Sequence, residues 1–145
     1  MGDISKDIKS KFPNAKVKAL INVIYTANWI NSLQNDYFKT YGISPQQFNV
    51  LRILRGAEEP LKVQTIKERM VERAPNATRL MDKLFDKNYI NRLPCPNDRR
   101  VVHIEITQQG LNLLKNIDKD NKVDILKNLS NEEAEQLSDL LDKLR

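Results

Sequence analysis

Apolar residues recur with helical spacing along most of the chain. The longest such segment, residues 16–41, contains neither glycine nor proline, and its pattern predicts one continuous helix. The segment ISPQQF then has the features of a helix start, with Ser44 as N-cap, Pro45 at the first helical position and Gln47 completing a capping box. We expect this second helix to end at Gly56.

Two shorter helices and a hairpin are predicted next. The first helix covers about residues 64–72. The second opens at Pro75, and its apolar residues fall at positions i, i+3, i+4, i+7 and i+8. This spacing predicts a buried face made of Ala77, Leu80, Met81, Leu84 and Phe85. Strands are expected over 90–93 and 101–106. Two short helices followed by a hairpin have the proportions of a winged helix-turn-helix.

Two further helices close the chain. Thr107 is expected to cap a helix that runs to about Lys127, and Ser130 with Glu133 forms a second capping box for the last helix. An apolar stripe on this last helix is formed by Leu137, Leu140, Leu141 and Leu144. The stripe has little to cover within one subunit, and the first helix is long for so small a chain. Both features predict an obligate dimer.

The charge is unevenly distributed over the 145 residues. The net charge is +5, but residues 52–106 carry +4 and residues 107–145 carry −2. A basic middle segment permits an anionic partner such as nucleic acid.

Several classes of protein are disfavoured by what the sequence lacks. Cys95 is the single cysteine, so no disulfide forms within the chain, and no apolar segment has the length of a membrane span. The N-terminal residues lack the apolar core of a signal peptide, which favours the cytoplasm. No catalytic triad, phosphate loop or carboxylate pair stands out, and His103 has no second ligand near it. We therefore expect no enzyme activity, cofactor or metal.

The second helix of a helix-turn-helix enters the DNA major groove. The polar residues that this helix would offer are Asn76, Thr78, Arg79 and Lys83. Arginine can bind guanine with two donors, and asparagine can bind adenine in a similar way. The alternative is that these residues form the solvated side of an amphipathic helix.

The expected hairpin places two positive charges at its tip. Arg99 and Arg100 follow the turn residues Pro96, Asn97 and Asp98, and an arginine there suits a narrow minor groove. We interpret Asp98 as the residue that positions Arg100. A solvated turn without a partner is the alternative.

These segments together resemble the MarR family of bacterial transcription regulators. The resemblance rests on PQQFNVLRIL, PLKVQTIKERM, NATRLMDKLFDKNYINR and DRRVVHIEIT-QQG, which follow one another in the order and spacing of the family. The resemblance implies a mostly α fold, a winged helix-turn-helix with a small β-hairpin, in which residues 1–145 form one domain. Residues 16–41 and 107–145 would then be the dimerisation helices, and residues 44–106 the DNA-binding lobe.

The resemblance also implies partners. A homodimer would bind double-stranded DNA at a palindromic operator, with a recognition helix in the major groove and a wing in the minor groove. The chain departs from the family at Pro75-Asn76, where a Ser-Thr pair is frequent, and at Lys62, where a threonine cap is frequent. Pro75 removes one backbone N–H that could bind phosphate.

Some questions stay open at this point. The protein could be a constitutive repressor or one relieved by a small aromatic or anionic ligand, and Tyr25, Trp29 and Tyr37 could line a ligand pocket or pack at the dimer interface. Cys95 has no cysteine partner within the chain, so we expect an inert thiol rather than a redox switch. The competing hypothesis for the whole chain is a winged-helix interaction module that docks an acidic protein partner.

Overall fold

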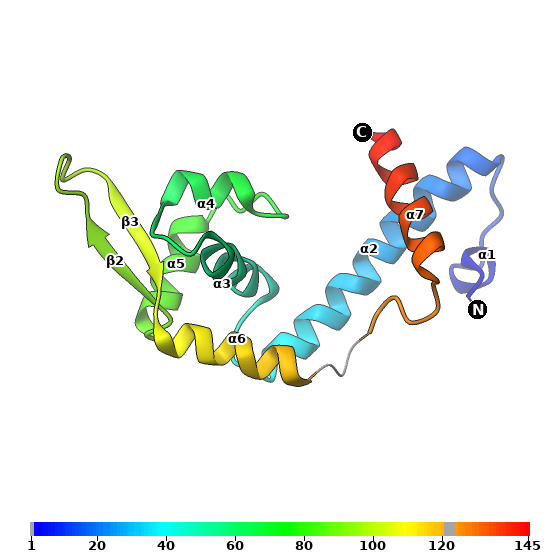
Figure 1. Cartoon of the computed structure of the whole chain (residues 1–145). Helices are drawn as coiled ribbons and strands as arrows, with labels where there is room; N and C mark the ends of the chain where they lie inside the picture. The colour runs from blue at the N-terminus through cyan, green and yellow to red at the C-terminus, as the bar shows by residue number, and fades with distance from the viewer. Residues whose placement is uncertain (1, 121–123) are drawn as a thin grey trace. The chain divides into compact units, whose positions relative to one another are not determined.

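The computed structural model describes residues 2–120 and 124–145, which are mostly helical with a small antiparallel sheet (Figure 1). The chain groups into two compact units, Met1–Leu114 and Lys115–Arg145, and each is described by itself. None of the helices in the described parts combines the length and the apolarity that crossing a membrane requires.

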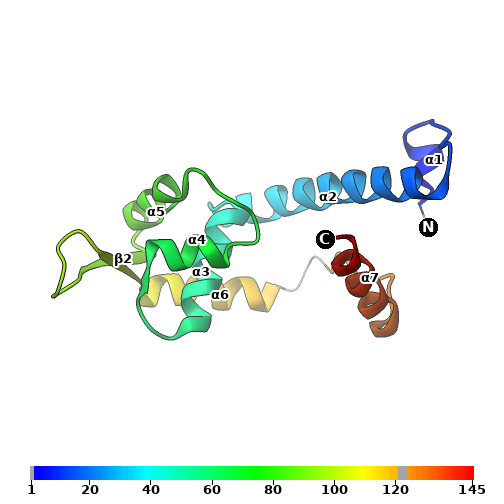
Figure 2. The ribbon, with the colours of Figure 1, turned by 90° about the horizontal axis from the view of Figure 1, so that it is seen from above.

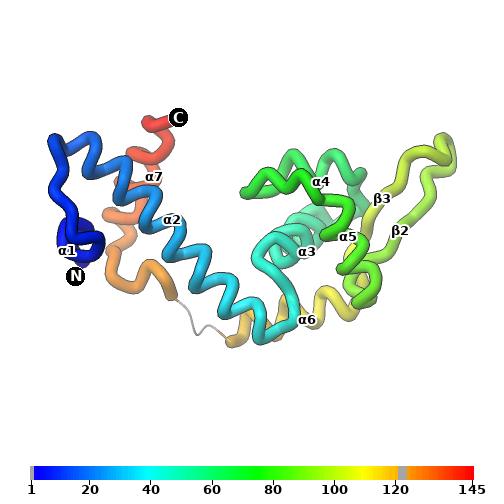
Figure 3. Tube along the Cα trace, turned by 180° about the vertical axis from the view of Figure 1, so that it is seen from behind, coloured from blue at the N-terminus to red at the C-terminus, as the bar shows by residue number. Residues whose placement is uncertain are grey.

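Helix α2, Ala15–Lys39, confirms the long first helix of the pattern. It follows the short α1, Ile4–Asp7, and begins where the Asn14 side chain accepts a hydrogen bond from the Val17 amide at 3.0 Å. Only its C-terminal end lies beside α3, as Figure 3 shows. There the Phe38 ring stacks on Phe48 with centroids 4.3 Å apart, and Phe38 is the one buried residue that α2 contributes.

Helix α3, Pro45–Ala57, starts with the predicted capping box. The Ser44 hydroxyl accepts a hydrogen bond from the Gln47 amide at 3.1 Å, and the Gln47 side chain accepts one from the Ser44 amide at 2.9 Å. The prediction that Gly56 ends this helix is wrong. The helix continues to Ala57, which packs against the core, and Glu58 ends it with a φ of 55°.

The hairpin belongs to a sheet with one more strand than the two predicted. The strands are β1 (Leu61–Lys62), β2 (Ile90–Pro94) and β3 (Val102–Ile106), in the order β1-β3-β2 with antiparallel pairing. Leu61 and Arg92 lie on either side of Ile104. The sheet thereby joins the segment before α4 to the hairpin, and its inner face covers the helical core.

The helix-turn-helix consists of α4, Val63–Arg69, and α5, Ala77–Asp86. The prediction that Pro75 opens the second helix is wrong by two residues, because the Ala77 amide donates to the Ala74 carbonyl and closes a turn around Pro75. The predicted buried face of α5 is confirmed for Ala77, Met81 and Leu84, and Leu80 packs against it. Phe85 departs from the prediction and is 41% exposed.

The start of α6, Gln108–Asp120, is tied to the turn that connects α5 with β2. The Thr107 hydroxyl accepts a hydrogen bond from the Gly110 amide at 3.0 Å, as expected of a cap, and donates one to the Asn88 carbonyl at 2.7 Å. The Thr107 amide donates to the Tyr89 carbonyl at 3.0 Å. A Cβ atom at Gly110 would stand 2.5 Å from that same carbonyl oxygen, so only glycine fits here without movement.

The second unit contains α7, Asn131–Leu144, with the predicted capping box between Ser130 and Glu133. The pKa of Glu132 lies below its usual value, because its carboxylate accepts hydrogen bonds from its own backbone amide and from the Ser130 hydroxyl. The preceding helix was predicted to reach Lys127. Its described part runs to Asp120, and positions 121–123 lie outside the described residues. Residues 125–128 form a turn, so the predicted end at Lys127 is wrong.

The contact at Gly110 makes a direct prediction about stability. Gly110→Ala should lower the free energy of unfolding by about 1–3 kcal/mol, the usual cost of overpacking, because the new methyl group meets backbone. Gly56→Ala is the matched control. Gly56 lies inside α3 with open space at its Cβ position, so alanine should stabilise by up to about 1 kcal/mol.

Urea denaturation at one fixed protein concentration, followed by circular dichroism, measures both changes. Equal unfolding midpoints for Gly110→Ala and the wild type would show that the helix start moves away from Tyr89 without cost.

Candidate nucleic-acid interface

Helix α5 turns a polar face to solvent. Ala77, Met81 and Leu84 are buried on one side, and this orientation leaves the predicted contact residues Asn76, Thr78, Arg79 and Lys83 exposed on the other. The structure therefore brings these four residues together on one exposed surface at the N-terminal end and middle of a single helix.

The N-terminus of α5 is open. Asn76 is the N-cap but makes no side-chain capping hydrogen bond, in contrast to Ser44 and Ser130 at the starts of α3 and α7. Pro75 lies in the turn before the helix, so its missing N–H does not belong to the first helical turn. The amides of the first turn carry a partial positive charge and suit an anionic oxygen such as a phosphate.

The turn before α5 is fastened to α3. The Val71 amide donates to the Asn49 side-chain oxygen at 2.9 Å, and the Gln46 side chain donates to the Glu72 carboxylate at 2.8 Å. Both bonds join residues that are more than 20 positions apart, so they fix the connection between α4 and α5 in space.

Two basic side chains that the sequence pattern did not single out hold the C-terminal half of α5. Lys87 donates through Nζ to the Gly42 carbonyl in the α2–α3 connection. Arg92, on β2, forms an ion pair with Asp82 and places its guanidinium 4.9 Å from the centre of the Phe85 ring. The importance of Arg92 could have been inferred from the strand register. Arg92 pairs across the ladder with the buried Ile104, at a position where an apolar residue would be usual.

The tip of the hairpin projects beyond the helices of the lobe, as Figure 1 and Figure 2 show. Its turn is closed by hydrogen bonds from the Val101 amide to the Asp98 carbonyl at 3.1 Å and from the Cys95 amide to the Val101 carbonyl at 3.1 Å. The Asp98 side chain accepts a hydrogen bond from the Arg100 amide at 2.9 Å. Asp98 thus acts on Arg100 through the backbone amide and orders the turn at that residue. The side chains of Arg99 and Arg100 are exposed.

Other candidate residues do not assemble into a site. Within residues 2–120 and 124–145, no three His, Cys, Asp or Glu side chains gather as metal ligands would. Trp29 is 48% exposed and Tyr25 is exposed as well, whereas Tyr37 packs edge to face on Phe38 and on Tyr41. Cys95 is a half-buried free thiol.

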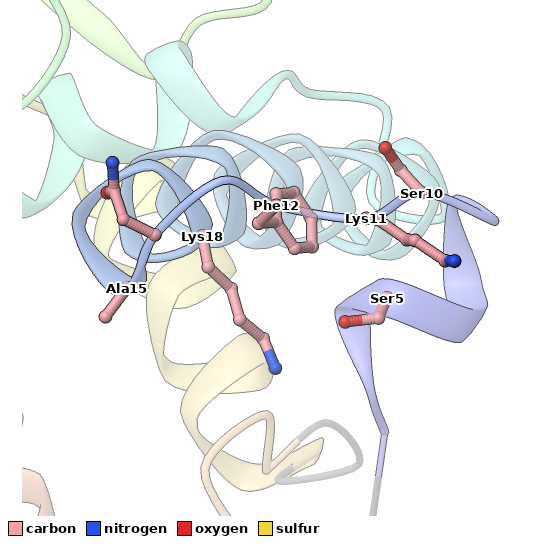
Figure 4. A pocket seen from close by; sticks show the side chains of 7 residues that line it. Ser5, Ser10, Lys11, Phe12, Ala15 and Lys18 are labelled. Carbon is pink, nitrogen blue, oxygen red and sulfur yellow. The ribbon is translucent and has the colours of Figure 1, made fainter.

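A surface depression near the N-terminus is shown in Figure 4. Its side chains come from α1, from the connection to α2 and from the start of α2: Ser5, Ser10, Lys11, Phe12, Asn14, Ala15 and Lys18. None of the three aromatic residues considered for a ligand pocket is among them.

The comparisons with known proteins agree with this geometry. A sequence model of the MarR family matches residues 43–102, which span the helix-turn-helix and most of the hairpin. The regulator MhqR of Bacillus subtilis, an HTH-type transcriptional regulator, is 32% identical over 119 residues, which cover 79% of this chain and 81% of MhqR. The chain belongs to the MarR family. The multiple antibiotic resistance protein MarR of Escherichia coli is also 32% identical, over 77% of this chain and 80% of that protein.

Solved structures of the family share the whole fold. A mutant MarR from Escherichia coli complexed with operator DNA has a TM-score of 0.75 and 27% identity, and the match covers 99% of each chain. A MarR transcription factor from Planctomyces limnophilus has a TM-score of 0.70 and 29% identity over 92% of this chain and 98% of that one. Membership confirms the resemblance, the winged-helix fold class and the expectation of a DNA-binding transcription regulator rather than an enzyme.

The hydrogen bond at the wing tip leads to a prediction for Asp98. Asp98→Asn keeps an oxygen that can accept from the Arg100 amide, so DNA affinity should stay within about twofold of the wild type. Asp98→Ala removes the acceptor and should cost about 0.5–1.5 kcal/mol per subunit, the usual net value of one hydrogen bond.

Fluorescence anisotropy with one labelled duplex measures both variants. If Asp98→Asn loses as much affinity as Asp98→Ala, the negative charge of Asp98 matters and the turn geometry does not.

Proposed function

We propose that this chain is a homodimeric repressor that binds a palindromic operator and is relieved by a small molecule. The observation that carries the proposal is the joint geometry of α5 and the hairpin. An open helix N-terminus and a basic solvent-facing surface stand beside a wing with two exposed arginines. The likeness to a MarR structure complexed with operator DNA supports it.

In the major groove we assign base contacts to the residues on the exposed face of α5. Arg79 is suited to guanine and Asn76 to adenine, through paired hydrogen bonds. Thr78 and the amides of the first turn would bind a phosphate, and Lys83, one turn further along, would contribute a second charge. These roles agree with the position of Arg79 in the first turn of α5, where a recognition helix contacts base edges.

In the minor groove we assign the contact to the wing tip. Arg100 would enter the groove, Arg99 would bind the phosphate backbone, and Asp98 would hold the turn that presents both. Because a narrow minor groove attracts any guanidinium, this contact reports DNA shape and charge more than base identity.

The dimer is inferred from apolar surface in each of the two units. On α2, Leu20, Ile24 and Trp29 are about half exposed. On α7 no residue is buried, and Leu140 and Leu144 are 66% and 64% exposed. Apolar surface of this kind marks an interface. We propose that residues 16–41 and 107–145 form it and that residues 44–106 form the DNA-binding lobe.

A regulator of this kind would act in the cytoplasm, where bacterial DNA is found, and block access to a promoter. A small aromatic or anionic molecule is the proposed ligand. The crystal structure of NadR was solved in complex with 4-hydroxyphenylacetate, and its 24% identity to this chain shows a shared fold.

Selection from a random pool of DNA duplexes tests the function. Successive rounds with the purified protein should enrich an inverted repeat with two equal half-sites, since a two-fold symmetric dimer presents two recognition helices. Enrichment of no sequence would contradict the proposal and favour an interaction module with an acidic protein partner.

Substitutions of Arg79 and Arg100 should weaken DNA binding in different ways. Arg79→Ala should cost about 1–3 kcal/mol on the selected operator and relax the preference at one base pair of each half-site. Arg100→Ala should weaken binding to selected and scrambled duplexes alike and should reduce the salt dependence by about one unit per subunit.

Titrations of both variants on the operator, on single-base variants of it and at two salt concentrations measure these effects. Equal losses of Arg79→Ala on operator and scrambled DNA would remove it as a base-contacting residue.

The dimer interface leads to a separate prediction. Leu140→Asp should raise the dimer dissociation constant by at least about 100-fold, because a symmetric interface loses two buried leucines, each worth about 1.5–3 kcal/mol. Ser138→Asp adds the same charge to an exposed position of α7 and should leave the dimer intact. Sedimentation analysis over a range of concentrations measures both, and dimers of unchanged stability in Leu140→Asp would contradict the assignment of α7 to the interface.

A further inference from the structure

Arg92 stands where the apolar core between the hairpin and α5 ends. Residues at alternating positions of β2 share one face, so Arg92 is on the same face as the fully buried Ile90, although its own side chain is 38% exposed. Its partner across the ladder is Ile104, which is also buried. A third apolar residue would be expected at this position, and the chain has an arginine there.

The Arg92 side chain bridges β2 to two successive turns of α5. Its guanidinium pairs with the Asp82 carboxylate and lies over the face of the Phe85 ring, 4.9 Å from the centre. Asp82 and Phe85 are three positions apart and therefore neighbours on the helix surface. The arginine covers the ring that the periodicity had assigned to the core, which explains how Phe85 can stand at the edge of the packed region.

The three residues form a clamp between the helix that we assign to the major groove and the strand that leads to the wing tip. The hydrogen bonds of Thr107 hold the base of the hairpin, at Asn88 and Tyr89. Arg92 lies further along β2, in the direction of the tip. Strand β1 already holds the β3 edge of the hairpin at Ile104 and His103, and the Arg92 contacts hold the β2 edge against α5 at the same level. Held on both edges beyond its base, the hairpin keeps a set angle to α5.

We propose that Arg92, Asp82 and Phe85 position the wing relative to the recognition helix, and that Arg92 acts through this clamp rather than by contact with DNA. The inference rests on the proposed DNA-binding function. A rigid angle matters because the wing and the helix must reach two adjacent grooves at once. Without the clamp the hairpin would be mobile, and fixing it on DNA would cost conformational entropy and so weaken operator binding.

The alternative for an exposed arginine near DNA is a phosphate contact, and the two roles predict opposite effects of one substitution. Asp82→Asn removes the partner of Arg92 and also removes a negative charge. As a positioning change it should weaken operator binding on the order of tenfold, since each of two subunits loses an ion pair and orients the ring contact less well. If Arg92 binds phosphate, the same change frees it and should tighten binding.

Asp86→Asn is the matched control, because Asp86 is an exposed carboxylate on the same helix and no clamp contact involves it. Compared with the wild type, this variant should bind both the selected operator and a scrambled duplex with equal or slightly higher affinity, because it carries one negative charge fewer. The ratio of operator to scrambled affinity should therefore fall for Asp82→Asn and stay constant for Asp86→Asn.

Two further variants separate positioning from charge. Arg92→Lys keeps the charge but loses the planar group that stacks and pairs, so selectivity should fall while the salt dependence stays unchanged. Phe85→Leu should lower selectivity in the same direction. Circular dichroism melting curves check that each variant is folded, which is expected because all three clamp side chains are partly exposed.

Footprinting on the selected operator tests the angle directly. Asp82→Asn should lose hydroxyl-radical protection in the minor groove while guanine N7 protection in the major groove persists. If Asp82→Asn behaves like Asp86→Asn in affinity and footprint, the clamp has no role. If the wild type shows no preference for any duplex, the proposed function fails, and that result is distinct from failure of the clamp alone.

Discussion

The winged-helix lobe depends on one close approach between two backbones. The first turn of α6 passes so near to the Tyr89 carbonyl that position 110 has no room for a Cβ atom. This approach lets Thr107 bind the Asn88 and Tyr89 carbonyls from one position, with its hydroxyl and its amide. The end of α5, the start of β2 and the start of α6 therefore meet at one junction. The T-x-x-G motif of the sequence has a packing function: threonine supplies the hydrogen bonds and glycine supplies the space.

Away from this junction, fewer contacts hold the parts of the lobe that we assign to DNA. The turn before α5 is held by Asn49 and Gln46, and its far end by Lys87. The buried face of α5 packs in the core, and the polar face of this helix makes few contacts within the chain. The hairpin is fixed at its base, is bridged again at Arg92 and ends in a tip that is ordered by local hydrogen bonds. Such an arrangement lets the side chains adapt to DNA while the backbone that carries them stays in place.

The sequence predicted those features that depend on neighbours within a few residues. The capping boxes at Ser44 and Ser130 and the cap at Thr107 are local in origin, and the structure shows all three. It did not predict that β1 joins the hairpin, because Leu61 and Ile104 are paired only by the tertiary fold. Gly56 looked like a helix end, yet packing of Ala57 carries α3 onward and Glu58 adopts the left-handed conformation instead. The exposed polar residues of α5 were correctly placed on one surface, because helical periodicity determines which side of α5 faces the core.

Arginine shows most clearly why a count of charges does not define a binding surface. Arg79, Arg92 and Arg100 contribute equally to the net charge of the basic middle segment. Their surroundings assign them to different tasks. Arg79 is exposed in the first turn of α5, and Arg100 is exposed at a turn that Asp98 orders. Arg92 is partly exposed, but its guanidinium is paired with Asp82 and lies over the Phe85 ring. A charge that is paired within the chain has little left to offer a phosphate, so the effective basic surface is smaller than the composition implies. Among these three arginines, Arg79 and Arg100 therefore contribute most to the attraction for DNA, and Arg92 contributes least.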